Sequence, residues 1–252
     1  MAKRVYQMLQ ERREQQRKSF AVLIDPDKVD RQSCIHIASL AKQAKPDFFL
    51  IGGSLITSAR LEEVVGTLRE FTDIPTILFP GSNVHVSQNA DALLFLCLIS
   101  GRNPEYLIGQ QVVAAPMLKS SSLEIVSTGY ILVNCGNQTT VSYISNTTPI
   151  PYDKPEIAAA TAMAGEMLGM KVMYMDGGSG AQKPIGAKTI QHVRKSVDTP
   201  VIVGGGIRSK AEASTAFEAG ADVVVIGTAI EENPGLLIDI CDCTREFNES
   251  LV

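Results

Sequence analysis

The stretch Tyr174-Met175-Asp176-Gly177-Gly178-Ser179-Gly180-Ala181 carries most of the information about the fold of this 252-residue chain. It is the first of three glycine-rich turns, each of which directly follows a short apolar, β-branched run. The other two turns are Gly204-Gly205-Gly206 and Gly227-Thr228. Because consecutive parallel strands end at the same edge of a sheet, three such turns bring unpaired backbone N–H groups together, which suits the binding of a phosphate. The pattern favours a phosphate site over three unrelated turns.

The rest of the chain alternates apolar runs with segments of helical pattern. Continuous apolar runs are typical of parallel strands buried on both faces. The predicted strands are Phe20–Ile24, Asp47–Ile51, Thr76–Phe79, Ala92–Leu98, Tyr130–Val133, Lys171–Met175, Val201–Val203 and Val223–Ile226. The predicted helices are Val5–Lys18, Gln32–Ala44, Arg60–Phe71, Pro104–Leu118, Lys154–Leu168, Ala187–Val197 and Lys210–Ala219. Eight strands in this order predict a (β/α)8 TIM barrel of the α/β class.

No linker or low-complexity stretch divides the chain, so we expect residues 1–252 to form a single domain that opens with a helix over about residues 2–18. The interval Gly81–Ala90 is short and polar and predicts a turn or a one-turn helix. The segment Asn137–Asp153 is long for a connecting loop, and we expect it to form a lid or wall over the active-site mouth.

Composition excludes several classes of function. The net charge is -4 and there is no sustained basic patch, which argues against nucleic acid as the main ligand. The five cysteines are scattered without zinc spacing and predict reduced thiols. No apolar run of about 18 residues and no signal-peptide pattern is present, so we expect a cytoplasmic protein.

In a TIM barrel the carboxyl ends of the strands carry the chemistry. Asp25 follows the first predicted strand, and Ser54 follows the second. Together they could bind Mg²⁺, which needs few protein oxygens when a diphosphate and waters complete its shell. Asp25 could instead cap the turn formed with Pro26 and Asp27. Asp176 could be an N-cap of the next helix or a base beside the phosphate site.

Taken together, several motifs resemble those of the geranylgeranylglyceryl phosphate synthase family, in the family's order and from about Phe20 to Asn233. The motifs are Leu23-Ile24-Asp25-Pro26-Asp27-Lys28, Gly52-Gly53-Ser54, Asn103-Pro104-Glu105-Tyr106-Leu107-Ile108-Gly109, the Tyr174–Ala181 stretch, Val203-Gly204-Gly205-Gly206-Ile207 and Gly227-Thr228. Other phosphate-binding barrels share the late glycine turns, whereas the Asp-Pro-Asp and Gly-Gly-Ser pair and the Tyr-x-acid-x-Gly-Ser-Gly run are more specific. The chain looks like the second of the family's two groups.

The resemblance implies a prenyltransferase that joins sn-glycerol 1-phosphate to a polyprenyl diphosphate, usually geranylgeranyl, and forms an ether. It implies Mg²⁺ held by Asp25 and Ser54, with Tyr174 and Asp176 acting at the glycerol hydroxyl. The family more often has Glu where this chain has Asp176, which draws the carboxylate back by one methylene. The implied glycerol 1-phosphate site comprises Tyr174, Met175, Asp176, Gly177, Gly178, Ser179, Gly180, Gly205, Gly206, Gly227 and Thr228.

Three further expectations and two rival functions accompany this assignment. The helix Pro104–Leu118 is apolar over much of its surface (Leu107, Ile108, Val112, Val113 and Met117), and with the resemblance it predicts a homo-oligomer. A lipid product implies peripheral contact with a membrane, and no nucleic-acid partner is expected. The rivals are another phosphate-binding barrel enzyme that needs neither Mg²⁺ nor an isoprenoid, and a catalytically silent phosphate-binding or scaffold protein.

Overall fold

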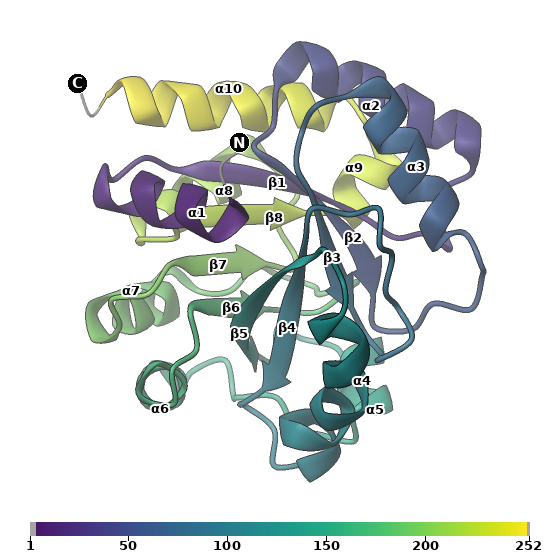
Figure 1. Ribbon diagram of the computed structural model, residues 1–252. Coiled ribbons are helices and arrows are strands. Elements are labelled where there is room, and N and C mark those ends of the chain that lie inside the picture. The colour runs from purple at the N-terminus through teal and green to yellow at the C-terminus, as the bar shows by residue number, and fades with distance from the viewer. Residues whose placement is uncertain (1–3, 251–252) are drawn as a thin grey trace.

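The computed structural model describes residues 4–250 and shows a closed parallel barrel in which β1 to β8 follow one another in chain order (Figure 1). The predicted TIM barrel is therefore confirmed. The strands are β1 Ser19–Ile24, β2 Phe48–Gly53, β3 Thr76–Pro80, β4 Ala92–Leu98, β5 Glu124–Leu132, β6 Val172–Asp176, β7 Val201–Gly204 and β8 Val223–Ile226.

Helices surround the barrel and fill most of the intervals between strands (Figure 1). They are α1 Val5–Glu14, α2 Arg31–Ala44, α3 Leu61–Phe71, α4 Gln110–Lys119, α5 Thr140–Ile144, α6 Pro155–Met167, α7 Ala187–Ser196, α8 Lys210–Glu218, α9 Thr228–Glu232 and α10 Leu236–Glu249. A π-helical turn, η1 Glu105–Gly109, opens into α4. Within residues 4–250 no helix is both long and apolar enough to cross a bilayer.

The side chains of the strands form two apolar layers. Alternate residues, such as Phe48, Leu50, Tyr130 and Tyr174, point into the barrel and pack there, while their neighbours pack under the surrounding helices. The register pairs Leu132 of β5 with Asp176 of β6. Side chains alternate along a strand, so the residue two positions after the last inward apolar residue also points inward. At the carboxyl end of a strand this residue lies at the mouth of the barrel, as Asp176 does after Tyr174.

Helix α1 closes the opposite end of the barrel. Val5 and Leu9 are buried against the inner layer, and the Glu124 carboxylate accepts hydrogen bonds from the N–H groups of Val5 (2.6 Å) and Tyr6 (3.2 Å). The predicted end of this helix at Lys18 was wrong. Gln16 adopts a left-handed conformation (φ 58°) and the N–H of Arg17 bonds back to Arg12, which terminates the helix in a Schellman motif without the usual glycine.

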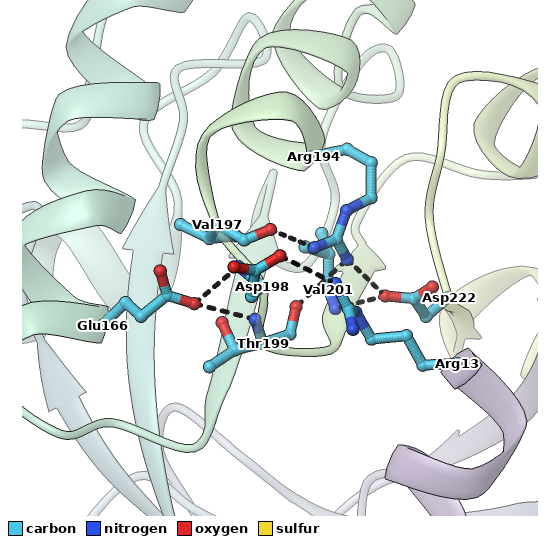
Figure 2. Close-up of polar contacts among 8 residues, drawn as sticks. All are labelled: Arg13, Glu166, Arg194, Val197, Asp198, Thr199, Val201 and Asp222. Atoms are coloured by element: carbon cyan, nitrogen blue, oxygen red, sulfur yellow. Dashed lines mark hydrogen bonds and ion pairs between the residues drawn. The ribbon is translucent and has the colours of Figure 1, made fainter.

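A polar cluster joins α6, α7 and the amino ends of β7 and β8 (Figure 2). The guanidinium of Arg194 donates to the carboxylate of Asp222 (2.7 Å), which also accepts the N–H of Val201 (2.8 Å). Glu166 at the end of α6 accepts the N–H groups of Asp198 (2.6 Å) and Thr199 (2.8 Å). The cluster satisfies backbone donors, including the buried N–H of Val201, at the end of the barrel away from the mouth.

Several predicted boundaries needed correction. Strand β5 begins at Glu124 rather than Tyr130. The residues from Glu124 to Tyr130, which include the buried polar Thr128, pair with β4 along its whole length. No helix lies between β3 and β4, as the polar Gly81–Ala90 interval suggested. The segment Asn137–Asp153 contains α5, and the helices α9 and α10 after the last strand were not predicted.

Candidate functional site

Two adjoining hollows occupy the mouth of the barrel. The first, which we term the polar pocket, encloses about 960 Å³ including its opening and lies among the ends of β1, β2, β6, β7 and β8. The second, the apolar groove, encloses about 840 Å³ on the same measure and lies between β3, β4, α4 and α5. Gly53, Ser54 and Phe79 line both hollows. One continuous site therefore has a polar end and an apolar end that meet at these three residues.

The three glycine turns line the polar pocket with backbone donors. Within the described residues, the N–H groups of the following residues donate no hydrogen bond: Ser179, Gly180, Gly205, Gly206, Gly227 and Thr228. Several of the glycines have positive φ, including Gly205 (83°) and Gly206 (77°), which turns successive N–H groups toward one point. This arrangement is suited to an anion with several oxygens.

Packing beneath the second turn leaves no room for side chains. A Cβ on Gly205 would lie 2.6 Å from the N of Gly177 and 2.7 Å from Oδ1 of Asp176. A Cβ on Gly206 would lie 2.4 Å from the carbonyl oxygen of Lys183. Glycine is therefore required by both conformation and space at the two central positions of the second turn.

Two residues of the predicted stretch do not face the pocket. The side chain of Met175 is buried in the outer apolar layer. The N–H of Gly177 is already bonded to the carbonyl of Gly204 (3.0 Å). The other predicted site residues line the polar pocket: Asp25, Ser54, Tyr174, Asp176, Gly178, Ser179, Gly180, Gly205, Gly206, Gly227 and Thr228.

The carboxylate of Asp176 is buried and held by two donors. The hydroxyl of Tyr130 donates to Oδ2 at 2.5 Å, and the N–H of Gly178 donates to Oδ1 at 2.7 Å. Burial raises the pKa of Asp176, although both hydrogen bonds oppose that rise. The N-cap interpretation of Asp176 was wrong, because the next helix, α7, begins only at Ala187. The residue is a buried carboxylate with an elevated proton affinity at the floor of the pocket.

An aromatic cluster lies where the two hollows meet. Phe79 stacks on Tyr174 with ring centroids 4.9 Å apart, and Tyr130 lies 5.6 Å from Tyr174. Tyr130 lines the apolar groove, Tyr174 lines the polar pocket, and Phe79 lines both. Burial raises the pKa of both tyrosines well above the ordinary value, so that they carry hydroxyl groups rather than phenolates.

Asp25 and Ser54 lie at neighbouring strand ends. A Cβ on Gly53 would lie 3.4 Å from Oδ2 of Asp25, so the carboxylate rests against the start of the turn that carries Ser54. Oδ1 of Asp25 accepts the N–H of Asp27 (3.0 Å). One side chain therefore caps the turn through Oδ1 and lines the pocket with Oδ2, which lies 3.8 Å from the ammonium of Lys28.

Asp27 fastens the loop that follows Ser54. Its carboxylate accepts the N–H groups of Thr57 (2.7 Å) and Ser58 (2.9 Å) and the hydroxyl of Thr57 (2.8 Å). Hydrogen bonding by Ser58, chiefly through its side chain, and by Thr57 holds the pKa of Asp27 well below its usual range. The second acidic residue of the Asp-Pro-Asp motif thus positions the loop after β2 rather than contributing to the pocket.

Sequence patterns missed several lining residues. Tyr130 was noted only as part of a strand, and its contact with Asp176 depends on the pairing of β5 with β6. Arg208 and Glu231 also line the polar pocket, as does Lys28, which belongs to the Leu23–Lys28 motif but was given no role in the site. Glu231 lies on α9, which has no strong sequence signal, so no pattern pointed to it.

Comparison with known proteins identifies the family. The sequence model of the PcrB family matches residues 8–244. A geranylgeranylglyceryl phosphate synthase of Spirosoma linguale is 53% identical over 236 residues, which are 94% of this chain and 95% of the relative. The protein of the same name from Methanothermobacter marburgensis is 41% identical over 94% of each chain.

Solved structures agree. The crystal structure of (S)-3-O-geranylgeranylglyceryl phosphate synthase from Thermoplasma acidophilum, in complex with the substrate sn-glycerol-1-phosphate, superposes with a TM-score of 0.92 at 32% identity, covering 97% of this chain and 100% of the other. The fold and site define a phosphate-binding TIM-barrel enzyme with an adjoining apolar groove. The chain belongs to the PcrB family, that of the geranylgeranylglyceryl phosphate synthases, which are prenyltransferases.

Proposed function

We propose that the protein is a Mg²⁺-dependent prenyltransferase of ether-lipid synthesis. It joins sn-glycerol 1-phosphate to a polyprenyl diphosphate, with geranylgeranyl diphosphate as the expected donor, and releases diphosphate. The observation that carries the proposal is the continuity of an apolar groove with a polar pocket ringed by unpaired N–H groups. An enzyme that used no isoprenoid would have no need for the groove, which disfavours the rival barrel enzyme.

The two substrates are expected to meet at the shared residues. The phosphate of glycerol 1-phosphate accepts hydrogen bonds from the glycine turns, and its glycerol hydroxyls face Tyr174 and Asp176. The prenyl tail lies along Leu94, Leu98 and Leu118 in the groove. This placement brings the diphosphate end of the donor to Ser54 and Phe79, beside the pocket.

In the reaction, the bond between the allylic carbon and the diphosphate oxygen breaks, and the glycerol hydroxyl oxygen forms the ether bond to that carbon. The hydroxyl proton passes to the carboxylate of Asp176, whose raised pKa suits it as a general base. The aromatic faces of Phe79, Tyr130 and Tyr174 adjoin the region where positive charge develops on the allylic carbon.

Asp25 and Ser54 provide oxygen donors that fit Mg²⁺. The residues 4–250 contain no group of three or more His, Cys, Asp or Glu side chains that could hold a metal, so two protein ligands with waters and a diphosphate form the expected set. A bound Mg²⁺ would neutralise charge on the departing diphosphate.

The deciding assay incubates the enzyme with labelled glycerol 1-phosphate, Mg²⁺ and prenyl diphosphates of different lengths, and extracts the lipid product. We expect product formation, with sn-glycerol 1-phosphate preferred over its enantiomer by about tenfold to a few hundredfold, because the enantiomer presents its secondary hydroxyl away from Tyr174 and Asp176 and loses hydrogen bonds there. Equal rates with both enantiomers would show that Tyr174 and Asp176 do not read the hydroxyls. A wild-type protein that makes no lipid product would overturn the proposed function.

Substitution of the proposed Mg²⁺ ligands gives the first mutational prediction. Asp25→Asn is expected to abolish turnover without unfolding the protein, because it removes the only charged ligand of the proposed pair. Ser54→Ala is expected to raise the Mg²⁺ requirement less severely, since water can replace a neutral ligand. Turnover measured across a Mg²⁺ titration checks both variants, and near-normal activity of Asp25→Asn at limiting Mg²⁺ would exclude the metal role.

We also propose a homo-oligomer and contact of the protein with a membrane surface, where a lipid product would be released. Large apolar side chains of η1 and α4 are exposed: Ile108, Val112, Val113 and Met117. Leu107, predicted to belong to this surface, instead packs against the core. Tyr143 and Ile144 of α5 extend the exposed set, and the Tyr106 hydroxyl joins η1 to α5 through the carbonyl of Ile144 (3.4 Å).

A further inference from the structure

Lys28 places an ammonium group at the edge of the polar pocket. Its Nζ lies 3.1 Å from Oε2 of Glu231 and 3.8 Å from Oδ2 of Asp25. The side chain of Glu231 is only 14% exposed and that of Lys28 is 42% exposed. The ammonium therefore stands between a largely buried carboxylate of α9 and the carboxylate at the end of β1, with one side open to solvent.

The charges that line the polar pocket suggest that Lys28 binds an anionic group. Among the described residues that line the polar pocket, Lys28 and Arg208 are the cations. The guanidinium of Arg208 donates hydrogen bonds to the carbonyl oxygens of Ala181 (2.8 Å) and Gly206 (3.4 Å), and so links the first two glycine turns. A diphosphate and a phosphate monoester bring several negative charges into a site that already holds Asp25, Asp176 and Glu231. Lys28 is the cation that adjoins Asp25, whereas two of the five N–H donors of Arg208 already hold the glycine turns.

We propose that Lys28 binds the departing diphosphate and that Glu231 is the positioning residue that holds its ammonium beside Asp25. This inference rests on the proposed function. A lysine ammonium is a compact charge with three donors on a flexible stem. It can therefore keep its contact with Glu231 while donating to a diphosphate oxygen. The hydrogen bond to the diphosphate becomes stronger as negative charge builds on the leaving group.

Position favours the diphosphate over the phosphate of glycerol 1-phosphate. Lys28 is three residues from Asp25, which adjoins Ser54 at the junction with the apolar groove. The unpaired N–H groups of the three turns, among the described residues, already provide hydrogen-bond donors for the phosphate monoester. A partly exposed ion pair contributes little to folding, so a purely structural role of the Lys28–Glu231 pair predicts near-normal substrate binding when the pair is removed.

The test compares Lys28→Ala, Lys28→Arg and Glu231→Gln with Lys42→Ala, an exposed lysine in the last turn of α2 outside the pocket. The measured quantities are the KM for each substrate, kcat, and the affinity for inorganic pyrophosphate with Mg²⁺ by calorimetry. We expect Lys28→Ala to weaken pyrophosphate binding and raise the KM for prenyl diphosphate by about 10-fold to 100-fold, with the KM for glycerol 1-phosphate changed by less than about twofold.

The other variants sharpen the result. Lys28→Arg should restore most of the pyrophosphate affinity because it returns the charge, Glu231→Gln should show a smaller loss of the same kind, and Lys42→Ala should match the wild type. Unchanged pyrophosphate affinity in Lys28→Ala, or a rise confined to the KM for glycerol 1-phosphate, would overturn the inference. Absence of lipid product from the wild type would instead refute the proposed function, and the calorimetry would still report on Lys28.

Discussion

Among single residues, Asp176 combines a functional position with a cost to folding. Burial raises its pKa, so the native state holds the proton more tightly than the unfolded chain, and stability falls as pH rises from the unfolded pKa through the folded pKa. Asp176→Asn removes the charge and keeps an oxygen that can accept the N–H of Gly178.

We therefore expect Asp176→Asn to lose turnover while gaining in the free energy of unfolding at pH 7. Because the wild-type carboxyl is protonated in both states at low pH, the gain should disappear there. Urea unfolding at the two pH values measures the difference. A variant less stable than the wild type at pH 7 would show that the lost Tyr130 hydrogen bond outweighs the relieved charge.

Gly205 shows how backbone conformation and space act together. Gly205→Ala puts a Cβ within 2.7 Å of Oδ1 of Asp176, so it should displace the turn and abolish binding of glycerol 1-phosphate. Gly169→Ala is the matched control, because Gly169 also has positive φ (86°) but nothing lies within 4 Å of the added Cβ. The control should lose about 1 kcal/mol of stability with an unchanged KM for glycerol 1-phosphate. Equal KM values in the two variants would contradict the assignment of this turn.

On the scale of secondary-structure elements, α1 stabilises the barrel without contributing to the mouth. Leu9 is 3% exposed against the inner layer, so Leu9→Ala should lower the free energy of unfolding by about 2 to 5 kcal/mol while leaving the KM of both substrates unchanged. Leu168→Ala, at a site 76% exposed, should change it by less than about 0.5 kcal/mol. Altered KM values in Leu9→Ala would indicate that the closed end of the barrel communicates with the mouth.

The whole molecule presents an apolar surface on η1 and α4 that we assign to a second copy of the chain. Val112 is 62% exposed, so Val112→Glu should leave the fold intact and convert the oligomer to smaller species in light scattering at micromolar concentration. Leu168→Glu on the far end of α6 is the control and should keep the wild-type mass. A monomeric wild type would refute the oligomer, and dissociation by Leu168→Glu alone would move the interface to α6.

Sequence patterns alone predict the barrel, its strand order and most of the polar pocket, because these follow from local features of the chain. Apolar runs mark buried strands wherever they lie, and strand ends in a parallel barrel must share one mouth. The positions of Asp25, Ser54, Asp176 and the glycine turns at that mouth follow from this rule alone.

Only the tertiary structure decided which side chains meet across strands and helices. Tyr130 reaches Asp176 through the register of β5 with β6, and Lys28 reaches Glu231 across 203 residues of chain because α9 folds back beside the end of β1. The apolar groove likewise forms only when α4 and α5 pack beside β4. Such contacts depend on packing between segments that are distant in the chain, and neither segment carries a sequence pattern that predicts the contact.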